Sequence, residues 1–243
     1  MKENRFFEEY NEFQKQFAEN ISERDRKMLA LVGDIIGGRP APVRLLDAGC
    51  STGNLLLHLK RAYPDLELVG GDLAPSSLAA ARNNPDLAGI EFRELNMLDI
   101  PDREAFDAVT SNAVAQFLAL DEYAQAAASI AQALKPGGAY ISFEWVHPFK
   151  GQDVEIKETT ASHPDGLMIY ARSQGRVAKV MKAAGFDDVT IDPFNIPIDL
   201  PMPPLDAIPD TYTRTLDTGE RLCFRGVLYQ PWVHVIAVKG EGT

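Results

Sequence analysis

The chain has 243 residues, of which 45% are hydrophobic and 24% are charged, and its net charge is −11. This composition is typical of a globular protein with a substantial core, and the length suits one domain with insertions. The acidity would repel a polyanion such as DNA or RNA, and the sequence has no basic patch that would overcome this field. We therefore expect no nucleic-acid partner.

The first residues, MKENRFFEEYNEF, are charged and lack the apolar core of a signal peptide. No apolar run reaches the roughly 18 residues that a membrane span needs, so we expect a cytoplasmic protein with no membrane partner. Cys50 and Cys223 have a spacing typical of neither a disulfide framework nor a metal site. Histidines and glutamates are scattered along the chain, and we expect no bound metal.

The predicted elements begin with a helix over residues 5–36, where apolar residues recur at steps of three and four, and GGRPAP ends this helix. Strands and helices then alternate, which predicts a mostly parallel sheet with helices on both faces. The predicted strands are 43–49, 66–72, 90–95, 106–112, 139–145, 187–191 and 232–238, and the predicted helices are 54–63, 74–84, 120–134 and 173–186.

Two segments interrupt the alternation. Residues 147–172 are largely polar and predict a loop, and residues 192–210 hold six prolines and predict an irregular crossing. Residues 212–216 and 221–229 flank DTGE, which predicts a hairpin inserted before the last strand. The fold class that we expect is therefore α/β, with a doubly wound, mostly parallel, seven-stranded sheet, an N-terminal helical segment and this hairpin.

The loop after the first strand lies in LLDAGCSTGN, residues 45–54. Ligands of doubly wound sheets bind outside the carboxyl ends of the strands, where glycines let the backbone approach them closely. The dinucleotide spacing G-x-G-x-x-G fails twice, at Ser51 and Asn54, which disfavours a nucleotide-dependent oxidoreductase. Asp47 would repel a pyrophosphate and would suit an ammonium or sulfonium cation. A tight turn, in which the aspartate bonds its own loop, is the alternative.

A second carboxylate, Asp72, ends the next strand in LELVGGD. Such a group can accept both hydroxyls of a ribose, and each hydrogen bond to a charged group contributes roughly 1.5–3 kcal/mol. A cap for the following helix is the alternative role. Two carboxylates beside a glycine loop, at the ends of successive strands, favour a nucleoside that carries positive charge.

Over residues 44–191 and the last strand, the chain resembles the class I S-adenosylmethionine-dependent methyltransferases, which have a Rossmann-like fold. The segments that carry the resemblance are, in order, LLDAGCSTGN, VGGDLAPSSLAAAR, ELNMLDIP, FDAVTSNAVAQFL, ALKPGGAYISF and MKAAGFDDVTI. Residues 1–243 would form one domain, with 1–36 as a helical lid and 43–146 as the cofactor-binding half. Residues 147–172 and 192–231 would be insertions on the substrate side.

The resemblance implies S-adenosylmethionine as the cofactor and a role for each matching residue. These residues fall into three sets: those at the methionine end of the cofactor, those that shape the loop beneath it, and those that contact the nucleoside. The methionine ammonium would face Asp47, and Asn112 and Ala113 would line the same end; Gly49, Ser51 and Gly53 would shape the loop; Asp72 would hold the ribose, and Leu73, Asn96 and the Met97 N–H would contact the adenine.

The sequence departs from the family pattern at two places. Ser51 replaces the usual middle glycine, and we expect the loop to keep its function if Ser51 has a negative φ. Gln116 and Phe117 stand where many relatives carry histidine, which removes one acid–base residue.

Methyl transfer is an in-line displacement, and an oxygen acceptor must also lose a proton to a base. His147 and Glu144, near the end of the fifth strand, are the candidates for that base. Alternatively, His147 bonds a loop carbonyl and Glu144 pairs with an arginine.

SNAVAQF lacks the Asn/Asp-Pro-Pro-aromatic sequence of enzymes that methylate nucleic-acid amines or glutamine amides, which favours a small-molecule acceptor. We expect an oxygen in a sugar or secondary metabolite, with nitrogen or carbon left open. A protein that binds the cofactor without turnover is the alternative. The sequence leaves the oligomeric state open.

Overall fold

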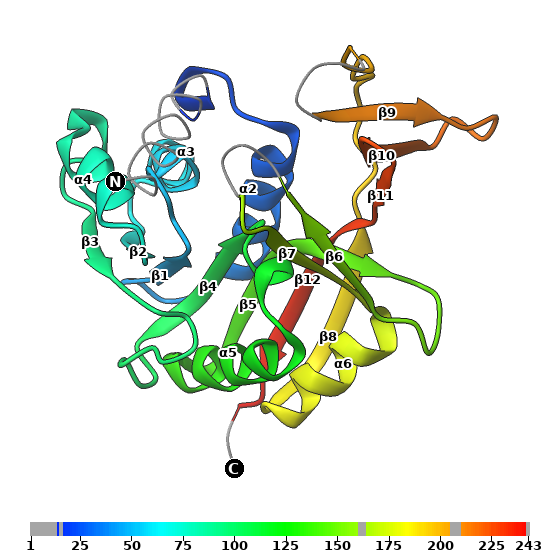
Figure 1. The fold of residues 1–243 in the computed structure, drawn as a ribbon. Helices are drawn as coiled ribbons and strands as arrows, with labels where there is room; N and C mark the ends of the chain where they lie inside the picture. Colours follow the sequence, from blue (N-terminus) through cyan, green and yellow to red (C-terminus); the bar gives the residue numbers. More distant parts are fainter. Residues whose placement is uncertain (1–13, 15–16, 160–163, 205–209, 242–243) are drawn as a thin grey trace.

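The computed structural model describes residues 14, 17–159, 164–204 and 210–241. A central sheet has the strand order β3-β2-β1-β4-β5-β12-β8, with helices on both faces (Figure 1). Its strands are β1 (Arg44–Ala48), β2 (Glu67–Asp72), β3 (Glu91–Glu94), β4 (Phe106–Asn112), β5 (Leu134–His147), β8 (Phe186–Pro193) and β12 (Trp232–Lys239). The expected seven-stranded, doubly wound sheet is confirmed.

The strand pairing gives all the sheet but one strand a common direction. The pairs among β1, β2, β3, β4 and β5 are parallel, whereas β12 is antiparallel to both β5 and β8. The carboxyl ends of β1, β2 and β4 therefore lie at one edge of the sheet, where ligands of doubly wound folds bind.

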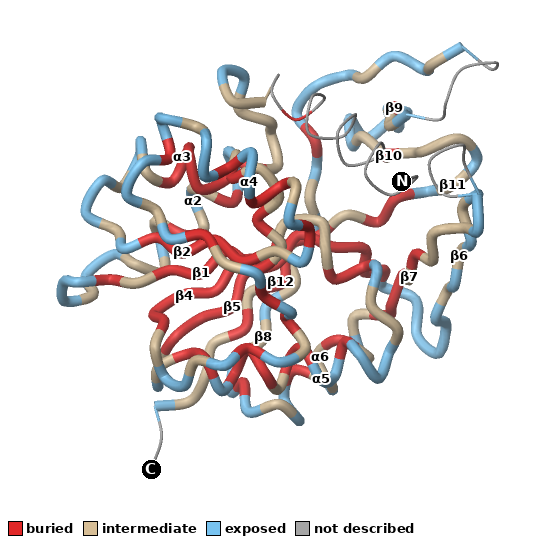
Figure 2. Tube along the Cα trace, turned by 60° about the vertical axis from the view of Figure 1, so that its left-hand side comes forward, coloured by how far each residue is buried: buried red, intermediate tan, exposed pale blue. Residues whose placement is uncertain are grey.

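The two faces of the sheet are buried by different helices. Leu45 packs in the cluster under α2 (Glu23–Ile36), α3 (Asn54–Ala62) and α4 (Pro75–Asn83), whereas Leu46 packs in the cluster under α5 (Leu120–Ala133). Successive strand residues point to opposite faces, so the apolar residues of a single strand contribute to the hydrophobic clusters on both faces of the sheet. The helix α6 (Gln174–Ala183) also covers the second face, and the strands between the layers are the most buried part of the chain (Figure 2).

The N-terminal helix does not run unbroken to residue 36 as predicted. Helical structure stops at Asn20, and α2 begins at Glu23. Ser22 caps this new start, because its hydroxyl accepts a hydrogen bond of 3.2 Å from the backbone N–H of Asp25. Residues 5–13 and 15–16 of the predicted helix lie outside the described residues.

The prediction of a loop over residues 147–172 is wrong. Strands β6 (Val154–Glu158) and β7 (Leu167–Ser173) form an antiparallel hairpin. The end of β7 also pairs in parallel with the end of β5, where Arg172 lies opposite Val146. The sequence VEIKE alternates apolar and polar residues, the pattern of a half-buried strand, although its overall composition is polar. Residues 160–163 lie outside the described residues.

The hairpin before the last strand is confirmed, and it belongs to a small sheet of β9 (Thr211–Thr215), β10 (Arg221–Arg225) and β11 (Leu228–Gln230). Arg225 of this sheet forms a bidentate ion pair with Glu158 of β6, in which Nε and Nη2 each donate to one carboxylate oxygen at 3.0 Å. The two insertions are therefore bonded to each other. Residues 205–209 lie outside the described residues. None of the helices in the described residues has the length and apolar character of a membrane span.

Candidate functional site

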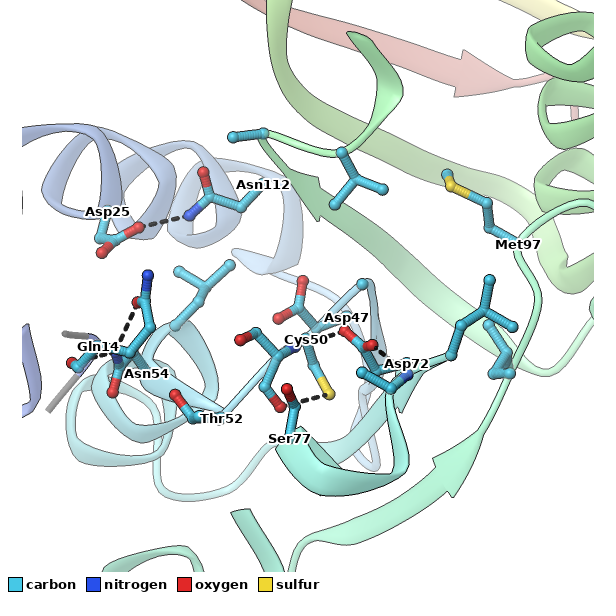
Figure 3. A pocket seen from close by; sticks show the side chains of 18 of the residues that line it. Gln14, Asp25, Asp47, Cys50, Thr52, Asn54, Asp72, Ser77, Met97 and Asn112 are labelled. Carbon is cyan, nitrogen blue, oxygen red and sulfur yellow. Dashed lines mark hydrogen bonds between the residues drawn. The ribbon is translucent and has the colours of Figure 1, made fainter. Parts of the chain in front are cut away.

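A pocket of about 310 Å³ opens at the carboxyl edge of the sheet, beside the N-terminal ends of α2 and α3 (Figure 3). This volume is near the lower end of the range for small-ligand sites. Parallel pairing of β1 with β2 and β4 brings the ends of the three strands together. Eight predicted cofactor residues line the pocket: Asp47, Gly49, Ser51, Asp72, Leu73, Met97, Asn112 and Ala113.

Four predicted site residues do not line this pocket: Gly53, Asn96, Glu144 and His147. Gly53 precedes α3 with φ +84°, a backbone conformation that glycine adopts without strain, and a Cβ there would lie 2.8 Å from the end of the Leu87 side chain. Asn96 is exposed, and its side-chain oxygen accepts a hydrogen bond of 3.0 Å from the backbone N–H of Leu98.

The loop after β1 has a left-handed backbone at three positions, Gly49, Ser51 and Gly53. Gly49 has φ +89°, and a Cβ on it would meet Val114 at 2.5 Å. Ser51 has φ +49°, so the condition of a negative φ, under which we expected the loop to keep its function, is not met. A left-handed conformation costs an L-residue roughly 1–2 kcal/mol. The glycine that the family usually has at position 51 would adopt this positive φ without strain, whereas Ser51 adopts it at a steric cost.

Asp72 uses its carboxylate to join two loops. One oxygen accepts a hydrogen bond of 2.8 Å from the Ser51 N–H, and the other accepts one of 2.8 Å from the Ala74 N–H at the start of α4. The N-cap residue of α4 is Ala74, which has no side-chain cap hydrogen bond, so Asp72 closes a local turn before the helix and does not cap it. Each carboxylate oxygen has a second lone pair, so Asp72 can still accept hydroxyl groups from a ligand.

Asp47 is almost fully buried at the bottom of the pocket, with 2% of its surface exposed. Burial raises the pKa of Asp47 to about 7, against the effect of a 2.8 Å hydrogen bond from the Thr110 hydroxyl. The negative charges of Asp25 and Asp72 raise that pKa further. A cation placed beside Asp47 would favour its ionised form.

A third carboxylate, Asp25, was missed by the sequence reasoning. It lies on α2 and accepts a hydrogen bond from the side-chain amide of Asn112 (Figure 3). Asp25 is buried together with Met28 and Val32, and the three residues form one face of α2. A carboxylate on the buried face of an amphipathic helix is unusual, and that signal could have identified it.

The donors and acceptors of the pocket fit S-adenosylmethionine. Carboxylates from α2, β1 and β2 gather around one small space, which suits a ligand that carries positive charge and hydroxyl groups. Gly49 leaves room for close approach of the backbone, and the buried Ser51 hydroxyl has no hydrogen-bond partner in the described part of the chain. At the far end, Met97 and Leu73 offer apolar surface of the kind on which a base packs. Among the described residues, no group of three or more His, Cys, Asp or Glu side chains is arranged so that it could hold a metal ion.

Glu144 and His147 occupy buried positions outside the pocket lining. Glu144 accepts hydrogen bonds from the hydroxyls of Ser142 and Tyr123, and burial raises its pKa. His147 is 5% exposed, and neither ring nitrogen has a hydrogen-bond partner among the residues that the structure describes. Glu144 points toward α5 through Tyr123, and His147 points to the opposite face of β5. The two side chains therefore do not act together.

Comparison with known proteins gives a consistent result. Residues 45–138 match the family model described as a methyltransferase domain. A demethylmenaquinone methyltransferase of Thermus thermophilus is 40% identical over 115 residues, which cover 46% of this chain and 51% of that protein. A tRNA N(3)-methylcytidine methyltransferase of Schizosaccharomyces pombe is 24% identical over 193 residues, which cover 72% of this chain and 78% of that protein.

A solved structure extends the likeness of the fold to nearly the whole chain. The 1,6-didemethyltoxoflavin-N1-methyltransferase of Burkholderia thailandensis, with bound 1,6-didemethyltoxoflavin and S-adenosylhomocysteine, matches with a TM-score of 0.60. The match covers 98% of this chain and 87% of that one, at 15% identity, and shows the common fold. This chain spans about half the length of the Thermus relative. Together, these matches show that residues 45–138 resemble a methyltransferase domain and that nearly the whole chain has the fold of that solved structure.

Proposed function

We propose that this protein transfers the methyl group of S-adenosylmethionine to a small-molecule acceptor. The observation that carries the proposal is the convergence of Asp25, Asp47 and Asp72 from three elements on one pocket beside Gly49. The bound cofactor supplies an electrophilic methyl group on a positively charged sulfur. The protein then has to hold that charge, orient the methyl group and admit an acceptor.

Within this proposal, each end of the pocket has its own task. Asp47 would face the ammonium of the methionine moiety, with Asp25 across the pocket adding negative charge. Asp72 would accept the ribose hydroxyls while it keeps its bonds to the Ser51 and Ala74 N–H groups. Leu73 and the backbone of Met97 would contact the adenine, and Asn96 would contribute less, because its side-chain oxygen already accepts from Leu98.

The acceptor that we propose is an oxygen of a sugar or secondary metabolite. The small-molecule class is supported by the net charge of −11, which disfavours polyanions, and by a relative named for a quinone substrate. Removal of the acceptor proton requires a base, and His147 remains our first candidate because neither ring nitrogen bonds another described residue, and the unprotonated nitrogen of the neutral ring can accept a proton. Glu144 is the second candidate, although it already accepts two hydrogen bonds.

A nucleic-acid acceptor is the second candidate function, because one relative is named as a tRNA methyltransferase. One experiment separates the two. The protein is incubated with methyl-labelled S-adenosylmethionine and either a low-mass metabolite extract or total RNA. Label in a low-mass product other than the cofactor itself, formed more slowly by Asp72→Ala, supports the proposal. Label only in RNA favours the second candidate. Binding of S-adenosylhomocysteine without transfer to either fraction would contradict both and favour a binding protein without turnover.

A further inference from the structure

One buried arginine reaches from the β6–β7 hairpin to the back of the cofactor pocket. Arg172 is 2% exposed and lies at the end of β7, where it pairs with Val146 of β5. Its guanidinium group donates hydrogen bonds to two backbone carbonyl oxygens, at 3.3 Å to Ala115 and, more closely, to Leu118. A buried arginine whose donors are used on a loop backbone fixes the position of that loop.

The segment that Arg172 holds forms one side of the pocket, and we call residues 113–118 the pocket wall. Ala113, Val114 and Phe117 line the pocket. Val114 lies directly over the loop after β1, because a Cβ on Gly49 would come within 2.5 Å of it. A small displacement of the wall would therefore change the width of the pocket above Gly49.

The pocket wall has little regular structure to keep it in place. It begins with a left-handed residue, Ala113, at φ +59°, and continues as a single short helical turn, η2 (Ala115–Phe117). Internal support comes from the Phe117 N–H, which donates to the Val114 carbonyl at 3.0 Å, and from the Gln116 amide, which donates to the Ala113 carbonyl at 2.8 Å. A backbone of this kind relies on contacts from outside to stay in one conformation.

The surroundings of Arg172 compensate its buried charge. The guanidinium group lies over the ring of Tyr123, 4.3 Å from the ring centre, a distance typical of a cation–π contact. The Tyr123 hydroxyl donates to Glu144 at 3.2 Å, so a carboxyl group lies behind that ring. Glu144 and Arg172 attract each other electrostatically. Arg172 thus contacts Tyr123 on one side and donates hydrogen bonds to the pocket wall on the other.

We propose that Arg172 is a positioning residue, which sets the distance between the pocket wall and Gly49 and so the fit of the amino-acid end of the cofactor. The inference rests on the proposed function, since it uses the cofactor placement given there. Arg172 lies outside residues 45–138, which match the family model, and it comes from the inserted hairpin. The insertion would thereby control a pocket built by the shared core.

Titration calorimetry with two ligands tests this inference. S-adenosylhomocysteine carries the amino-acid end, whereas 5′-methylthioadenosine keeps the nucleoside and lacks that end. In Arg172→Met we expect the affinity for S-adenosylhomocysteine to fall about tenfold, the equivalent of about 1.4 kcal/mol. The affinity for 5′-methylthioadenosine should change less than about twofold. Arg172→Lys, which keeps the charge and some donors, should recover part of the loss.

The matched control is Arg176→Met, which removes an exposed arginine of α6 that pairs with Asp153 at 2.9 Å. We expect this variant to bind both ligands like the wild type. An equal loss for both ligands in Arg172→Met, or no loss for either, would overturn the inference. If Arg172→Met does not fold, Arg172→Lys carries the same comparison. Failure of the wild type to bind S-adenosylhomocysteine would instead contradict the proposed function, so the two failures are distinguishable.

Discussion

The carboxylate of Asp72 accepts a hydrogen bond of 2.8 Å from the backbone N–H of Ser51 and thereby ties the loop after β2 to the loop after β1. The same carboxylate accepts from the Ala74 N–H at 2.8 Å. Asp72 thus supports the shape of the pocket and also faces the ligand from within it. Removal of this side chain should affect both properties.

We expect Asp72→Ala to weaken S-adenosylhomocysteine binding by about tenfold to a hundredfold, because it removes charge-assisted hydrogen bonds worth roughly 1.5–3 kcal/mol each. Asn96→Ala should cost less than about tenfold, since a neutral hydrogen bond contributes roughly 0.5–1.5 kcal/mol. Calorimetric titration gives both values, and thermal unfolding of each variant checks that the loops stay folded. The reverse order of the two losses would show that the ribose lies elsewhere.

The left-handed φ of Ser51 leads to a prediction about stability. Ser51→Gly should be more stable than Ser51→Ala by about 0.5–1 kcal/mol, because glycine adopts φ +49° without steric cost. Both variants lose the buried hydroxyl, so their difference isolates the backbone conformation. Chemical denaturation measures it as a shift of the midpoint at constant slope. Equal midpoints would mean that Ser51 is not strained in solution.

Much of this fold was predictable because the apolar strands alternate with helices along residues 43–146. The missed elements have specific reasons. Strand β6 has only five residues, and its exposed face made the segment look like a loop. The break before α2 depends on one capping serine, Ser22, inside a continuous helical pattern. Helix propensity and hydrophobic periodicity do not reveal that a single capping side chain interrupts the helix.

The site was predictable where it follows the strand ends, and less so where it depends on tertiary contacts. Asp47 and Asp72 are read directly from the ends of β1 and β2. Asp25 and Arg172 come from elements outside the family motifs, and their places depend on how α2 and the β6–β7 hairpin pack. The sign of φ at Ser51 is likewise set by the loop as a whole, and its residue type favours the opposite sign.

The raised pKa of Asp47 predicts a pH-dependent affinity. With a pKa of about 7, Asp47 is largely protonated at lower pH, and a cationic ligand must displace that proton. The affinity for S-adenosylhomocysteine should therefore rise between about pH 5.5 and 7, by at most about tenfold per pH unit, and then level off. Titrations in two buffers with different ionisation enthalpies should detect proton release below about pH 7.

Asp47→Asn is the control for this pH dependence, because an amide does not titrate. We expect the variant to bind more weakly and to show a flat profile over the same range. A wild-type affinity that does not change with pH would contradict the role given to Asp47. The same slope in wild type and Asp47→Asn would assign the titration to another group.

The candidate base can be tested once an acceptor is found. We expect His147→Ala to lower turnover by about a hundredfold or more, the usual effect of losing a general base. Affinity for S-adenosylhomocysteine should stay within about twofold, because His147 does not line the pocket. Glu144→Gln is the comparison, since glutamine keeps an oxygen for the Ser142 and Tyr123 hydroxyls. Normal turnover in His147→Ala with a loss in Glu144→Gln would reassign the base.

The central claim is that the three carboxylates surround a single nucleoside whose cationic ammonium group faces Asp47. Its most direct test is a calorimetric titration of the wild-type protein with S-adenosylhomocysteine, and separately with NAD, at about pH 7.5, where Asp47 is mostly ionised. We predict saturable binding of S-adenosylhomocysteine at one site per chain and no binding of NAD. Saturable NAD binding, with no response to S-adenosylhomocysteine, would contradict the account.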